Sequence, residues 1–148
     1  MRNKGNSYHH GDLKQALLAR GLEVLADNPA EMLSFRSLAS DLGVTKNAPY
    51  RHFRDREHFL GALINEGYRK LYEHMQDETT VPGLGRTYMD FAVHNQQLYR
   101  LMNSPLSCTL DEEYSVWPRK ALGLLAATLS GHDDSMDENS TAAAWAYI

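Results

Sequence analysis

The stretch from Phe35 to Phe53, FRSLASDLGVTKNAPYRHF, constrains the fold of this chain more than any other part of its sequence. Its first half predicts a short amphipathic helix, because apolar residues recur at positions i, i+3, i+4 and i+7: Phe35, Leu38, Ala39 and Leu42. Ser34 precedes this helix, where its hydroxyl can cap the first turn. Gly43 follows it, where a chain that leaves a helix often takes a positive φ.

The second half predicts another short helix, from Lys46 to Phe53, with Thr45 as its cap. Pro49 lacks a backbone donor and disfavours helical geometry at Ala48, so we expect an irregular first turn. The outward side chains of this helix are polar or aromatic: Lys46, Asn47, Tyr50, Arg51 and His52. Two helices joined by a short glycine turn are typical of a helix-turn-helix, and a purely structural αα-hairpin is the alternative.

A helix-turn-helix binds DNA because its second helix projects into a major groove about 12 Å wide. Outward residues there need hydrogen-bond donors and acceptors rather than core side chains. Lys46 and Asn47 lie at the N-terminus of the predicted helix, where the free N–H groups and the helix dipole also favour phosphate.

The strings SFRSLASDLGV, TKNAPYRHF and RDREHFL resemble the N-terminal domain of the tetracycline-repressor-like (TetR-type) transcriptional regulators. The chain is most similar to the branch that has APYRHF in the second helix and YHHGDL, here residues 8–13, at the start of the first. The resemblance is clear over about residues 8–72. It implies an all-α fold, in which a three-helix DNA-binding domain (8–71) is joined by a long helix to a helical ligand-binding and dimerisation domain (72–148).

The same resemblance implies the residues that contact DNA. Tyr50 corresponds to the tyrosine of the family's recognition helix, and Asn47 replaces a glycine that is common there, so the base preference should be this chain's own. The residues expected to face the groove are Thr45, Lys46, Asn47, Ala48 and Tyr50. Those expected on the phosphate backbone are Arg36, Arg51, His52 and Arg56. For Arg56 the alternative is a surface charge beside Asp55.

The charge distribution agrees with a nucleic-acid partner, although the 148-residue chain has a formal net charge of −4. Residues 1–56 contain nine Lys/Arg and six Asp/Glu, whereas residues 57–148 contain six Lys/Arg and thirteen Asp/Glu. A basic end on an acidic body suits a protein that meets phosphate with one face.

The rest of the chain predicts further helices. Asp12 is expected to cap a first helix from Leu13 to Ala26, and Asp55 a helix of about twenty residues that ends near Met75. The later segments are a turn at Glu78–Gly85, helices at Arg86–His94, Gln96–Met102 and Arg119–Leu129, an irregular acidic stretch at Ser104–Pro118, a loop at Gly131–Ser140 and a helix start at Thr141–Ile148. Because the last helix stops early, we expect residues to be missing there and in the 78–85 and 103–115 connections.

Other classes of protein are disfavoured. No apolar run approaches 18 residues and the N-terminus has no apolar signal region, which predicts a cytoplasmic protein without a membrane span. The lone Cys108 excludes an internal disulfide framework. His9 and His10 have no further ligands at a familiar spacing, so we expect no metal there and no cofactor. No catalytic triad or paired-carboxylate pattern occurs, so we expect no enzyme.

These features predict a ligand-responsive transcriptional regulator, a repressor that binds a pseudo-palindromic DNA operator as a homodimer. The alternative is a helical protein–protein interaction module. A small apolar or aromatic effector is expected in a cavity of the body, although the same side chains could simply fill its core. The predicted lining residues are Phe91, Tyr99, Met102, Trp117 and Trp145.

Overall fold

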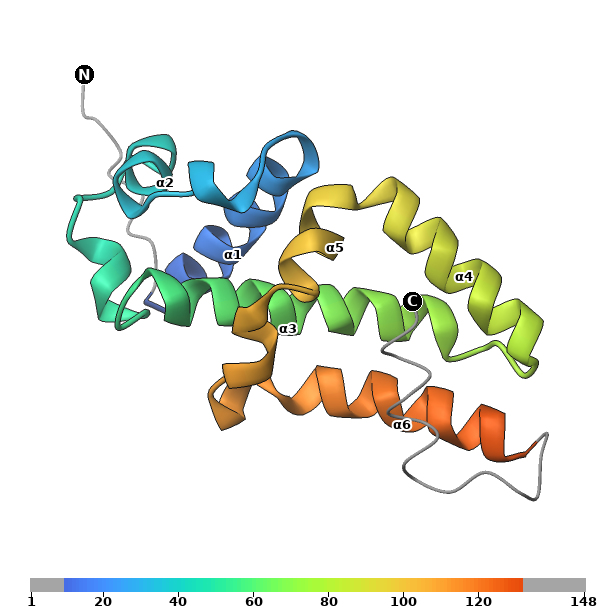
Figure 1. Ribbon diagram of the computed structural model, residues 1–148. Coiled ribbons are helices and arrows are strands. Elements are labelled where there is room, and N and C mark those ends of the chain that lie inside the picture. The colour runs from blue at the N-terminus through green and yellow to red at the C-terminus, as the bar shows by residue number, and fades with distance from the viewer. Residues whose placement is uncertain (1–9, 132–148) are drawn as a thin grey trace.

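The computed structural model describes residues 10–131, and this part of the chain is all-α and contains no strand, which confirms the predicted class. Its α-helices are α1 (His10–Asp27), α2 (Phe35–Asp41), α3 (Arg56–Met75), α4 (Val81–His94), α5 (Gln96–Met102) and α6 (Val116–Ser130) (Figure 1). Its 3-10 helices are η1 (Ala30–Met32), η2 (Ala48–Arg51), η3 (Pro105–Thr109) and η4 (Glu112–Tyr114). Trp145 and the predicted helix Thr141–Ile148 lie outside the described residues.

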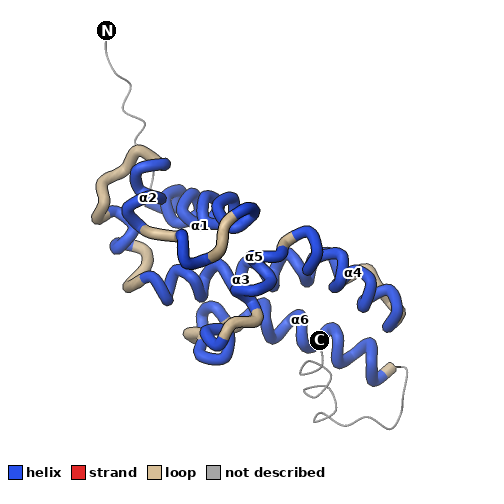
Figure 2. Tube along the Cα trace, turned by 45° about the horizontal axis from the view of Figure 1, so that its top comes forward, coloured by secondary structure: helices blue, strands red, loops and turns tan. Residues whose placement is uncertain are grey.

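Helix α3 is the axis of the molecule. It starts where predicted, because the Asp55 carboxylate accepts a hydrogen bond of 2.8 Å from the backbone N–H of His58. Helices α1 and α2 lie at its N-terminal end, while α4 and α6 flank its C-terminal half (Figures 1 and 2). Helix α3 therefore runs from the α1–α2 end of the molecule to the end that α4 and α6 flank.

The buried side chains form one hydrophobic cluster that crosses the predicted domain boundary at residue 71. Leu17 of α1, Leu63 of α3 and Met102 of α5 are each at most 1% exposed. Helix α1 approaches α3 closely at Gly21, because a Cβ atom there would lie 2.8 Å from Cζ of Phe59. Glycine at this position therefore allows the two helices to pack closely.

Several helix boundaries differ from the prediction. Helix α1 begins at His10, so Asp12 lies inside it rather than at its cap. Helix α4 begins at Val81, because the Thr80 hydroxyl accepts a hydrogen bond from the N–H of Gly83 and the first turn tolerates Pro82. The predicted turn at Glu78–Gly85 is therefore too long. Helix α6 likewise starts at Val116, three residues before its predicted start.

The largest difference concerns the second helix of the hairpin. Instead of an α-helix over Lys46–Phe53, the chain forms the 3-10 helix η2, and Thr45 is not its cap. The hydrogen bonds run over three residues, from Ala48 N–H to the Thr45 carbonyl (2.9 Å) and from His52 N–H to the Pro49 carbonyl (3.0 Å). Pro49 explains this, because its missing N–H and the restricted residue before it oppose regular α-helical bonding.

None of the helices between residues 10 and 131 is long and apolar enough to cross a membrane.

Candidate nucleic-acid interface

A tight turn sets the path of the chain from α2 into η2. The N–H of Val44 donates to the carbonyl of Ala39 (2.9 Å), and the N–H of Gly43 donates to that of Ser40 (3.1 Å). This pair of bonds is a Schellman motif, which needs a left-handed residue, and Gly43 has φ of +66°. The Ser34 hydroxyl caps the other end of α2 by accepting from Ser37 N–H at 3.2 Å. Both sequence predictions for the ends of α2 are confirmed.

The segment Thr45–Arg51 follows this turn and combines a buried base with an exposed outer surface. Ala48 is 8% exposed and Pro49 is fully buried, so these two residues anchor the segment. The outer surface consists of the exposed side chains Thr45, Lys46, Asn47, Tyr50 and Arg51. Because the anchor is apolar and the outer side chains are polar or aromatic, the segment presents hydrogen-bonding groups without using them in the core.

An aromatic cluster supports the segment from below. The ring of Phe35 contacts the ring of Tyr50 edge to face, with centroids 5.0 Å apart and planes at 85°. Phe35 also lies 5.4 Å from Phe59 of α3, and Phe53 lies 4.9 Å from Phe59. Tyr50 remains 58% exposed. Its ring is therefore held on one edge by α2, while the rest of the side chain faces outward.

Three exposed cations of this region are not neutralised by carboxylates. Arg36 on α2, Lys46 and Arg51 are exposed, and none of them forms a salt bridge within the described part of the chain. Arg20, by contrast, pairs with Glu23 and Asp41, both at 2.9 Å. Three unpaired positive charges near one hairpin favour a polyanion such as a nucleic-acid backbone.

The structure corrects one of the residues predicted to contact DNA, Ala48, and places another only partly at the surface. Ala48 is buried, because it packs under the segment. Arg56 is exposed, and it donates to the carbonyl oxygens of Leu33 (3.1 Å) and Ala30 (2.6 Å), so part of its guanidinium joins η1 to α3. The expected alternative, a surface charge beside Asp55, misses these bonds as well. His52 is half-buried.

The predicted ligand-binding residues are mostly used for packing. Met102 is 1% exposed and fills the space above Gly67, Tyr99 accepts a hydrogen bond from the Tyr88 hydroxyl (3.2 Å), and the ring of Trp117 lies 5.5 Å from that of Tyr72. Phe91 borders a cavity of about 330 Å³ with His74 and Asn95. Of the predicted lining residues within the described part of the chain, Phe91 alone borders one of the cavities discussed in this section.

A larger groove, of about 460 Å³, lies between α1, α3 and the junction of α4 with α5. Its apolar lining includes Leu18, Leu22 and Leu98, and Lys70 is the cation at its edge. Sequence reasoning missed this groove, because its walls come from the separate segments 15–26, 66–70 and 94–98, which meet only in the folded chain.

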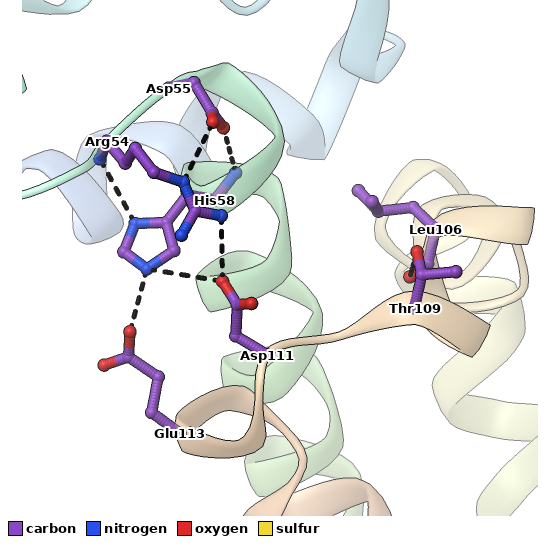
Figure 3. A network of polar contacts seen from close by, with 7 residues as sticks. All are labelled: Arg54, Asp55, His58, Leu106, Thr109, Asp111 and Glu113. Carbon is purple, nitrogen blue, oxygen red and sulfur yellow. Dashed lines mark hydrogen bonds and ion pairs between the residues drawn. The ribbon is translucent and has the colours of Figure 1, made fainter.

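Sequence reasoning also missed a polar network between the start of α3 and the connection from α5 to α6, which lies close in sequence to the segment Thr45–Arg51. Figure 3 shows Arg54 and His58, at the start of α3, facing Asp111 and Glu113 of the connection between α5 and α6. His58 Nε2 lies 2.8 Å from Glu113 Oε1 and 3.7 Å from Asp111 Oδ2. The pKa of Arg54 is raised, first by its hydrogen bond to Asp55 and then by the charge of Asp111. The acidic run Asp111–Glu113 was the sequence signal, but nothing in it identified His58 as the partner.

No family model and no curated protein matches this chain. Among solved structures, the chain is similar to a protein with unknown function from Rhodococcus sp. RHA1, with 28% sequence identity and a TM-score of 0.69. The similarity covers 85% of this chain and 70% of that one. The fold is therefore found in at least one solved protein.

Proposed function

We propose that this protein is a DNA-binding transcriptional regulator of the TetR type, with the segment Thr45–Arg51 as its reading surface. The observation that carries the proposal is a set of exposed polar, aromatic and cationic side chains around a segment with a buried base. Lys46, Asn47 and Tyr50 are exposed on a segment whose base is buried, and Arg36, Lys46 and Arg51 form no salt bridge within the described part of the chain. A surface of this kind offers donors to base edges and positive charge to phosphates.

A homodimer is part of the proposal, because two half-sites about 34–36 Å apart need two copies of the segment. Helix α6 supports it. Of the fifteen residues of this largely apolar helix only Ala121 is buried, and Val116 and Leu122 are 41% and 40% exposed. An apolar helix face that is open in one chain is suited to a second copy.

The small apolar or aromatic effector stays a prediction. The groove between α1 and the α4–α5 junction has a volume within the usual range for small ligands, about 300–1,000 Å³. A compound bound there would contact α1, α3 and the α4–α5 junction together. By linkage, the compound should lower the affinity for the operator by the same factor as the operator lowers the affinity for the compound. A compound that binds without any effect on operator affinity would contradict the effector proposal.

The proposal is tested by selecting DNA fragments with the purified protein and repeating the measurement with Asn47→Ala. We expect an enriched pseudo-palindrome for the unaltered protein. The substitution should cost about 1–3 kcal/mol of discrimination at one base pair of each half-site, because an amide side chain pairs bidentately with adenine. Asn103→Ala is the matched control, since this exposed asparagine lies in the body. Unchanged affinity and sequence preference for Asn47→Ala would rule out the assigned surface.

Arg51 and Arg56 form a matched pair for the phosphate contacts. Arg51→Ala should weaken all DNA sequences alike and reduce the slope of log K against log salt by about 1, because one phosphate contact is lost. Arg56→Ala should leave this slope unchanged and lower the free energy of unfolding by about 1 kcal/mol, since its bonds go to the Ala30 and Leu33 carbonyls. Binding titrations over a salt series separate the two. The reverse pattern would show that Arg56, not Arg51, meets the backbone.

A further inference from the structure

The polar network between the start of α3 and the connection from α5 to α6 brings together three side chains of the kinds that bind metals. His58, Asp111 and Glu113 each offer one ligand atom, and these atoms all lie within 4.8 Å of one another. They come from two separate elements, the first turn of α3 and the connection before α6 (Figure 3). His58 is held by its neighbours, because its ring contacts those of Phe53 and Tyr114 at 6.0 and 4.9 Å.

A second observation at the same place points to a missing partner. Tyr114 is 5% exposed, and its buried hydroxyl has no hydrogen-bond partner in the described part of the chain. Buried polar groups normally find a partner, so this one calls for an explanation.

Room for a small ligand exists beside these groups. A cavity of about 70 Å³ is bordered by Arg54, His58, Asp111 and Tyr114. A water molecule needs a site of only about 10–15 Å³ on the same kind of measure, so an ion with bound water fits.

We propose that this cluster binds one divalent transition-metal ion, of which Zn²⁺ is the best representative, through His58 Nε2 and the carboxylates of Asp111 and Glu113. One imidazole and two carboxylates are a ligand set that Zn²⁺ accepts, with water as the fourth ligand. Its bonds of about 2.0–2.2 Å require the ligand atoms to lie roughly 3.4 Å apart in a tetrahedral site. Asp111 and Glu113 are exposed and can adjust to this spacing.

The ion must compete with Arg54, which gives the proposal a distinctive signature. The Arg54 guanidinium donates to Asp111 Oδ2 at 3.2 Å, and its backbone N–H donates to His58 Nδ1 at 3.3 Å. A neutral imidazole that binds a metal through Nε2 carries its proton on Nδ1. Nδ1 can then no longer accept the hydrogen bond from the backbone N–H of Arg54. Metal binding therefore releases Arg54 from two contacts, three residues after Arg51. The inference concerns the protein alone and does not depend on the proposed DNA binding.

The test is isothermal titration of the whole chain with Zn²⁺, with Co²⁺ as the spectroscopic probe. We expect one ion per chain at this site and a raised Tm with Zn²⁺. Glu113→Gln and His58→Ala should each weaken binding by at least about 10–100-fold. Arg54→Gln should strengthen Zn²⁺ binding, because it removes a competing cation. Adventitious adsorption of Zn²⁺ to acidic groups would not depend on His58.

Two controls make the result decisive. His74→Ala removes an exposed histidine whose Nδ1 is bonded to the Lys70 carbonyl of its own helix, and it should change nothing. Replacing both His9 and His10 by alanine removes a histidine pair that could take up Zn²⁺ by itself. Binding that disappears with the His9 and His10 pair, or that survives His58→Ala and Glu113→Gln unchanged, overturns the proposal. So does the absence of binding to the unaltered protein.

Discussion

Replacing Phe53 by alanine is expected to lower the free energy of unfolding by about 3–5 kcal/mol, the usual cost of truncating a buried phenylalanine. Phe53 is 0% exposed. Its ring lies 4.9 Å from that of Phe59 and 6.2 Å from that of Phe35. The cavity left behind would border Phe35 and Phe59, so the proposed reading surface should lose its support as well. Urea unfolding followed by circular dichroism measures the change.

Met89→Ala is the matched control for Phe53→Ala. Met89 is a large apolar residue that is 55% exposed on α4, so its truncation should change stability by no more than about 0.5 kcal/mol. A loss below about 1 kcal/mol for Phe53→Ala would mean that the aromatic cluster does not support the hairpin as described.

Replacing Gly21 by valine should be the next most damaging change, with an expected loss of about 1–3 kcal/mol from overpacking. A Cβ atom at this position would lie 2.8 Å from Cζ of Phe59 and 3.1 Å from Cδ2 of Leu63, both in the core of α3. The Phe59 ring cannot turn aside freely, because it also packs on Phe35 and Phe53. Helix α1 must therefore move away from α3, which thermal or urea unfolding would detect.

Gly123→Ala supplies the opposite control. This glycine lies in α6, and a Cβ atom there would meet nothing within 4 Å. Alanine should stabilise the helix by about 0.5–1 kcal/mol, because glycine loses more backbone freedom on folding. If Gly21→Val proved as harmless as Gly123→Ala, the close approach of α1 and α3 would be wrong.

The candidate metal site and the candidate DNA surface meet at Arg54. If both proposals hold, an ion bound at His58 would free Arg54, which lies three residues after Arg51. The present contacts of Arg54 run to Asp55, Asp111 and the His58 ring. A change in operator affinity with Zn²⁺ would then link the two sites, and it would vanish in the Glu113→Gln variant.

The sequence by itself determined the parts of this fold that depend on neighbouring residues. Ser34 and Asp55 cap the helices that follow them, and Gly43 takes the positive φ that ends α2. The length of α3 also followed from the apolar residues that recur on one helical face, among them Leu60, Leu63, Ile64 and Leu71. Caps, left-handed turns and helical periodicity are set within about four residues along the chain, so a local pattern is enough to predict them.

Only the tertiary structure decided how the individual site residues are used. Pro49 pointed to an irregular turn, but the burial of Ala48 depends on the core below it, and the carbonyls bound by Arg56 lie more than twenty residues earlier. His58 and Glu113 are 55 residues apart and meet at 2.8 Å. Whether a polar side chain faces solvent, caps a distant carbonyl or joins a cluster depends on which remote segment packs beside it, and one chain's local pattern does not contain that information.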